Sequence, residues 1–146
     1  MVSFPQAVKL FFQRYTDFQG RSRRSEYWWV QLFNFLVLVI PYVLLISIGG
    51  LASGEPNIIG FILIAIMLIY VLAIIVPGIA LGVRRFHDLN QTGWLVLVFA
   101  VAGAIPLVGL LASIGQIVWF CFPGTTGPNK YGPDPRMGEV APDTFS

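Results

Sequence analysis

Two long stretches of this chain contain almost no charged residues, and this distribution of charge constrains the fold more than any other feature. Between Tyr27 and Val83 the only charged residue is Glu55, and none occurs between Leu89 and Pro128. Hydrophobic residues make up 56% of the 146 residues, and the mean hydropathy is +0.77. A soluble domain of this length has too little interior to bury so much apolar surface. The pattern therefore predicts an all-α integral membrane protein, with a single membrane domain over residues 1–146.

Three hydrophobic segments, 27–48, 58–82 and 94–122, are long enough to cross a bilayer, which takes about 20 apolar residues. Helices are expected because every backbone polar group must be satisfied inside lipid. A short connection rich in Gly and Pro predicts that the first two segments form an antiparallel hairpin. In the third, Pro106 should kink or break the helix. We expect one long, kinked span there. The alternative is a re-entrant hairpin whose two legs are too short to cross.

The first residues predict an amphipathic helix over 3–18, with Ser3 as N-cap and Gln6 completing a capping box. Its aromatic residues recur at helical spacing, so we expect the helix to lie flat in the headgroup region, apolar face down. The alternative is that this face packs on protein. The Gly- and Pro-rich tail, 123–146, is either an ordered loop anchored by Tyr131 or disordered.

Lys and Arg set the expected orientation. They are concentrated before the first hydrophobic segment and just after the second, whereas the connection between those segments has none. The positive-inside rule therefore places the N-terminus and the predicted loop 84–93 in the cytoplasm. A third span would then put the tail outside.

Five arginines are the candidates for contact with a lipid or a partner protein, because only Glu26 and Asp88 lie near them in the sequence to neutralise their charge. Unpaired arginines at the headgroup level attract anionic lipid. The alternative is that they only set topology. The candidates are Arg21, Arg23, Arg24, Arg84 and Arg85.

Polar residues that flank the hydrophobic segments predict a structural cluster. Asp88 is expected to pair with a nearby arginine. His87 is the only histidine, so a multi-histidine metal site is excluded, and it has no nucleophile beside it. We expect no metal, no cofactor and no nucleic acid partner. The cluster comprises Glu26, His87, Asp88, Asn129, Tyr131 and Asp134.

Three runs of sequence, in this order, resemble a known family: 20–28, 84–88 with 92–94, and 129–135. The break at 105–109 also fits the pattern of that family. The family is domain-of-unknown-function family number 805, which consists of small bacterial inner-membrane proteins. The resemblance extends from about Phe4 to Pro135, and Phe86 stands where many members carry leucine. It implies a location in the bacterial inner membrane, and it assigns no activity, substrate or catalytic residue.

Three functions are consistent with these features. The first is a non-enzymatic protein that binds anionic lipid or a partner protein through a basic cytoplasmic face. The second is a subunit of an oligomeric small transporter or channel, which would need more polar residues within the spans than this chain offers. The third is an enzyme acting on lipids. Whether the protein forms a homo-oligomer or binds another membrane protein stays open.

Overall fold

The structure is a computed structural model that describes residues 1–137. Over this range the regular elements are all helices, as the sequence predicts, and part of the predicted tail, 138–146, lies outside the described residues. The elements are α1 (Phe4–Gln13), α2 (Arg24–Ser47), a single 3-10 turn η1 (Leu51–Ser53), α3 (Ile58–Asp88), α4 (Leu95–Gly103) and α5 (Val108–Cys121).

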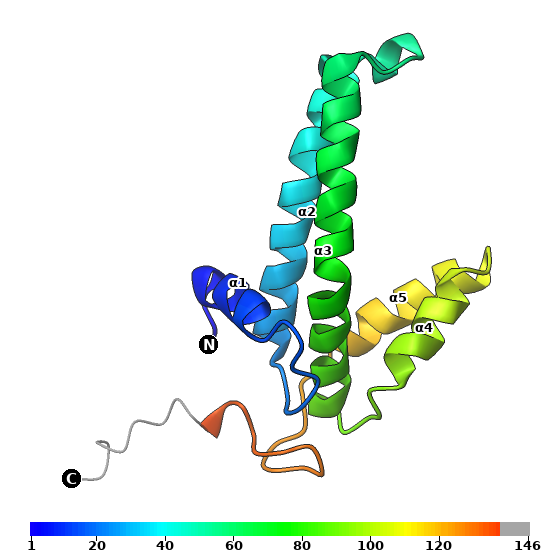
Figure 1. The fold of residues 1–146 in the computed structure, drawn as a ribbon. Coiled ribbons are helices and arrows are strands. Elements are labelled where there is room, and N and C mark those ends of the chain that lie inside the picture. The colour runs from blue at the N-terminus through cyan, green and yellow to red at the C-terminus, as the bar shows by residue number, and fades with distance from the viewer. Residues whose placement is uncertain (138–146) are drawn as a thin grey trace.

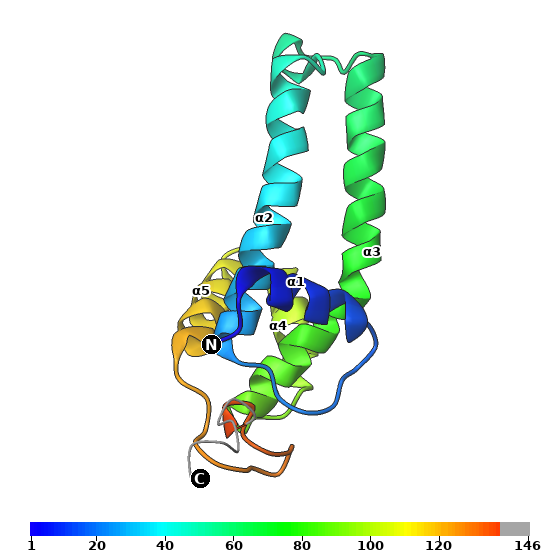
Figure 2. The same cartoon turned by 90° about the vertical axis from the view of Figure 1, so that its left-hand side faces the viewer.

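Helices α2 and α3 form the predicted antiparallel hairpin (Figures 1 and 2). At 24 and 31 residues they are about 36 and 46 Å long, and both are long and apolar enough to cross a membrane. The connection between them turns at Gly50 and Gly54, whose φ angles of 87° and 95° favour glycine. Asn57 caps α3, because its side chain accepts from the Gly60 amide at 3.0 Å.

The prediction that residues 84–93 form a loop is wrong for its first half. Helix α3 continues past residue 82 to Asp88, so Arg84 and Arg85 lie on its last turns. An ion pair of 2.7 Å between Arg85 and Asp88, three residues apart, favours the helical conformation here. The loop proper is therefore only a few residues long.

Helix α1 crosses α2 and α3 near the end of the pair that carries Arg24 and Asp88 (Figure 2). Part of its apolar face packs on protein, while Phe12 remains 44% exposed. The helix is shorter than the predicted 3–18, and Ser3 makes no side-chain capping bond, so the predicted capping box is wrong. The main buried cluster lies at this crossing and contains Val2, Ala7, Phe11, Val30 and Leu81.

The third hydrophobic segment is not one kinked span, and this expectation is wrong. It forms two helices, α4 and α5, which lie side by side and project away from α3 (Figure 1). At 9 and 14 residues they are about 14 and 21 Å long, and each is too short for a hydrocarbon core of about 30 Å. The chain reverses at Leu107, where the Val108 amide donates to the Pro106 carbonyl at 2.8 Å in a γ-turn.

The close approach of α4 and α5 depends on Gly109. A Cβ at this position would lie 2.6 Å from the Gly103 carbonyl oxygen. After α5 the chain returns beneath the end of α3, so residues 123–137 lie beside the segment that precedes α2 (Figure 1). The tail is ordered over these residues, and it is not separated from the other polar segments as one kinked span would require.

Candidate functional site

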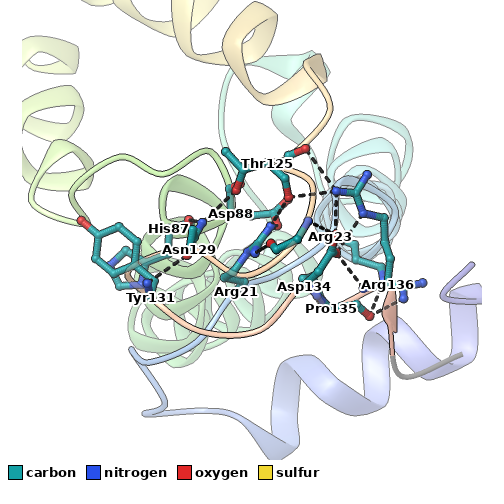
Figure 3. Close-up of polar contacts among 12 residues, drawn as sticks. Arg21, Arg23, His87, Asp88, Thr125, Asn129, Tyr131, Asp134, Pro135 and Arg136 are labelled. Carbon is teal, nitrogen blue, oxygen red and sulfur yellow. Dashed lines mark hydrogen bonds and ion pairs between the residues drawn. The ribbon is translucent and has the colours of Figure 1, made fainter.

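Three polar segments that are distant in the sequence meet at the end of α3 (Figure 3). They are the segment before α2, the last turns of α3 and the tail. We call this meeting place the polar junction. It comprises Arg21, Ser22, Arg23, Glu26, Arg84, Arg85, His87, Asp88, Thr125, Asn129, Asp134 and Arg136.

Arg84 and Arg85 are adjacent on α3, so their side chains leave the helix about 100° apart and contact different segments. Arg84 is fully buried and faces the segment before α2. Its Nε donates to Ser22 Oγ at 3.0 Å, and its Nη1 donates to the carbonyls of Arg14 and Asp17. Arg84 therefore holds the chain that links α1 to α2.

Glu26 provides the buried counter-charge for Arg84. Its Oε1 accepts from Ser22 Oγ at 3.0 Å and lies 3.7 Å from Arg84 Nη2. Burial raises the pKa of Glu26, and the positive charge of Arg84 opposes that rise. Ser22 thus bridges the two charged side chains.

Arg85 is also fully buried, and it binds the end of α5. Its Nη2 donates to the Phe120 and Phe122 carbonyls at 2.7 and 2.6 Å, while its Nη1 contacts Asp88 at 2.7 Å. A cation at a helix C-terminus satisfies carbonyls that lack an intrahelical partner. Arg85 therefore fixes the end of the α4–α5 hairpin against α3.

Asp88 is the centre of the junction. Its carboxylate accepts from Arg21 Nε at 3.0 Å and from Arg85, and its main-chain carbonyl accepts from the Thr125 amide at 2.9 Å. Gly124 packs directly on the carboxylate, which a Cβ at that position would overlap. Burial raises the pKa of Asp88, and its hydrogen bond to Arg21 opposes that rise.

Arginines of the segment before α2 hold the tail through its backbone. Arg21 donates to the Gly127 carbonyl at 2.7 Å and to the Thr125 carbonyl at 2.5 Å, and Arg23 donates to the Pro135 carbonyl at 2.9 Å. Figure 3 shows these side chains reaching across to the tail. The tail is therefore held by charged side chains from the other end of the chain.

The tail makes further contacts, both within itself and with His87 of α3. Asn129 Nδ2 donates to the His87 carbonyl and to Thr125 Oγ1, both at 2.9 Å. Asp134 accepts from the Gly127 amide and from Arg136, and the hydrogen bond to Arg136 holds the Asp134 pKa well below its usual range. Tyr131 stacks on His87, with ring centroids 3.8 Å apart and planes within 5°. The prediction that Tyr131 anchors the tail fits this contact.

The five arginines do not form the exposed patch that the sequence suggests. Arg21, Arg23, Arg84 and Arg85 are buried, and Arg24 is exposed. The buried guanidinium groups are not unpaired, because backbone carbonyls of the loops and tail accept hydrogen bonds from them. All six predicted members of the structural cluster do lie in or against the polar junction: Glu26, His87, Asp88, Asn129, Tyr131 and Asp134.

Sequence reasoning missed several members of the junction. Arg136, which the sequence analysis does not single out, pairs with Asp134 at 2.9 Å. Ser22 and Thr125 act through hydrogen bonds to Glu26 and to the Asp88 carbonyl. Short hydroxyl side chains are common in polar segments and give no distinctive pattern, so no sequence signal identifies these two.

Two adjoining cavities lie at the N-terminal end of α2. The first, of about 360 Å³, is lined by Arg23, Arg24 and Arg136, among others. Asp88 also lines it, but its carboxylate is already paired with Arg21 and Arg85. The second, of about 430 Å³, continues along α2 past Trp28 and Trp29 to Leu32. Met1, Arg24 and Ser25 line both. Within residues 1–137, no three His, Cys, Asp or Glu residues are grouped in a way that could hold a metal ion.

Comparisons with known proteins give relatives over most of the chain. A family model described as "Protein of unknown function (DUF805)" matches residues 15–133. Inner membrane protein YhaI of Escherichia coli strain K12 is 36% identical over 127 residues, covering 86% of this chain and 92% of the relative. Inner membrane protein YhaH of the same strain is 33% identical over 125 residues, with the same coverage. No solved structure matches significantly.

Proposed function

The chain belongs to the family described as "Protein of unknown function (DUF805)", and from this premise we propose that it is a non-enzymatic inner-membrane protein that binds anionic lipid headgroups beside Arg24. Two apolar helices of sufficient length support the membrane location, as do relatives that are named inner membrane proteins. Under this proposal α2 and α3 cross the membrane, and the α4–α5 hairpin enters it from one side.

The distribution of charge supports a cytoplasmic location for the polar junction. None of the nine Lys and Arg residues lies in the connection between α2 and α3. They lie in three places: before or at the start of α2, at the end of α3, and in the tail. The positive-inside rule then places the N-terminus, the junction and the tail on the cytoplasmic side. Helix α1 crosses the α2–α3 pair at that level, where an amphipathic helix can lie in the headgroup region.

The two adjoining cavities carry the proposal. A basic cavity that continues into one bordered by Trp28, Trp29 and Leu32 matches a lipid, whose charged headgroup is joined to an apolar chain. Arg24 lines both cavities, is exposed, and makes no hydrogen bond or ion pair within the described part of the chain. An arginine near the membrane surface attracts anionic lipid by about 1 kcal/mol.

The test compares Arg24→Gln with Lys9→Gln, which removes the same charge from an exposed position on α1. Each protein is placed in phosphatidylcholine nanodiscs that also contain phosphatidylglycerol, and the phosphatidylglycerol retained by the protein is measured by native mass spectrometry. A loss of about 1 kcal/mol corresponds to a roughly fivefold weaker affinity for Arg24→Gln. Lys9→Gln should change the affinity less than twofold. Equal effects of the two variants would show that the affinity for phosphatidylglycerol depends only on the net charge of the protein, and the site beside Arg24 would be rejected.

A further inference from the structure

A third cavity lies apart from the arginines, between the end of α3 and the start of α4. Its volume is about 540 Å³, within the range of small-molecule sites, and its walls are mainly apolar, with Phe18, Val83, Trp94 and Leu97 among them. Val83 directly follows the predicted span 58–82, and Trp94 is 73% exposed. Tryptophan favours the membrane interface, so this cleft lies at the level where membrane-dissolved molecules can enter.

One polar group on the cleft wall has a fixed orientation. The Nδ1 of His87 lies 3.1 Å from the Gly20 carbonyl oxygen. A carbonyl can only accept, so Nδ1 carries the hydrogen and, in the neutral ring, Nε2 holds a lone pair. Stacking on Tyr131 keeps the ring in this plane. Partial burial lowers the pKa of His87 from its usual 6.5, so the ring is neutral at pH 7.5.

The Nε2 atom of His87 is accessible because residue 93 is a glycine and has no side chain. A Cβ at Gly93 would lie 3.0 Å from Nε2 and 2.6 Å from Val83 Cγ1, so glycine keeps this part of the cleft free. Among residues 1–137, Nε2 makes no hydrogen bond. The cleft therefore combines mainly apolar walls with the Nε2 acceptor of His87, and the hydroxyl-bearing residues Thr92 and Tyr131 also line it.

We propose that this cleft binds a neutral, apolar molecule that carries a hydroxyl group, which donates a hydrogen bond to His87 Nε2. A lone pair repels a carboxylate or phosphate oxygen, and an apolar cleft disfavours a cation because of the cost of desolvation. Two kinds of membrane-dissolved molecule have the required chemistry: a prenylated quinol and a diacylglycerol. This site is separate from the headgroup site beside Arg24.

The test uses a decyl-chain ubiquinol, kept anaerobic, and dioctanoylglycerol, each added at pH 7.5 to the full chain in phosphatidylcholine nanodiscs. Each has a matched O-methylated analogue that keeps the apolar body and lacks the donor. We expect one of the two hydroxyl compounds to bind, and its methylated analogue to bind at least tenfold more weakly. Whichever compound binds identifies the source of the ligand.

Two variants separate the hydrogen bond from the fold. His87→Phe keeps an aromatic ring against Tyr131 and removes Nε2, and Leu97→Trp fills the cleft without altering His87. Both should weaken binding at least tenfold, and Leu97→Trp should keep the wild-type melting temperature. Arg24→Gln should bind the hydroxyl compound with wild-type affinity. Rejection of the headgroup site beside Arg24 would therefore not affect the result for the cleft. Binding of neither compound, equal binding of a methylated analogue, or full binding by Leu97→Trp would each overturn the proposal.

Discussion

Asp88 joins parts of the chain that are far apart in the sequence, because it accepts from Arg21 and from Arg85 while its carbonyl accepts from Thr125. Within residues 1–137, the further hydrogen-bond acceptors of both arginines are backbone carbonyls. Removing the charge of Asp88 would leave two buried guanidinium groups without their shared counter-ion, which is more costly than the loss of an exposed pair.

At this residue scale we predict that Asp88→Asn lowers the stability of the protein in detergent by about 3 kcal/mol, the usual effect of breaking a buried pair. The matched control is Asp17→Asn, which removes a more exposed pair with Arg14 of 2.8 Å and should cost less than about 1 kcal/mol. Thermal unfolding of the purified variants provides the comparison. Similar melting temperatures for the two variants would contradict the central role of Asp88.

The α4–α5 hairpin depends on an unusual backbone at its tip. Leu107 has φ 65° and ψ −51°, a conformation that leucine rarely adopts, and its side chain is 71% exposed. Glycine reaches positive φ without the steric cost of a Cβ. At residue 107 glycine should therefore be more stabilising than alanine, which is the reverse of their order within a helix.

At this element scale we predict that Leu107→Gly is more stable than Leu107→Ala by about 1 kcal/mol. The control position is Leu110, which is similarly exposed but lies within α5. There the alanine variant should be the more stable by about 1 kcal/mol, because glycine is a poor helix former. Thermal unfolding of the four variants tests this. The same order at both positions would argue against a γ-turn at residue 107.

The elements differ in how far the sequence predicts them. The α2–α3 pair follows from hydropathy alone, because its apolar runs match the thickness of a bilayer. Length could not decide between one kinked span and a hairpin for 94–122. The hairpin instead depends on the γ-turn at Leu107 and on the contact of Gly109 with the Gly103 carbonyl, both of which are tertiary features.

Most members of the candidate site could be predicted from the sequence, but its geometry could not. The sequence pointed to Asp88 and the arginines, but it suggested that the arginines face lipid. Arg84 and Arg85 can be buried because backbone carbonyls accept hydrogen bonds from them. Every residue has a backbone carbonyl, so the sequence does not indicate which carbonyls will be the partners. Arg24 differs because its side chain remains exposed.

On the scale of the whole molecule, the polar junction joins the segment before α2, the end of α3 and the tail into one unit (Figures 1 and 3). Opposite it, the connection between α2 and α3 carries no Lys or Arg. The fold is thus polarised along the α2–α3 pair. Because the α4–α5 hairpin returns the chain to its starting side, both ends of the described chain belong to the same face.

The central claim is that the tail shares the cytoplasmic side with the rest of the polar junction, and cysteine labelling in intact cells tests it most directly. In a Cys121→Ser background, single cysteines replace Ser53 in the α2–α3 connection and Lys130 in the tail. A membrane-impermeant thiol reagent should label the cysteine at position 53 in intact cells, and the one at position 130 only after permeabilisation. Labelling of position 130 in intact cells would mean that 94–122 crosses the membrane, and it would contradict the account.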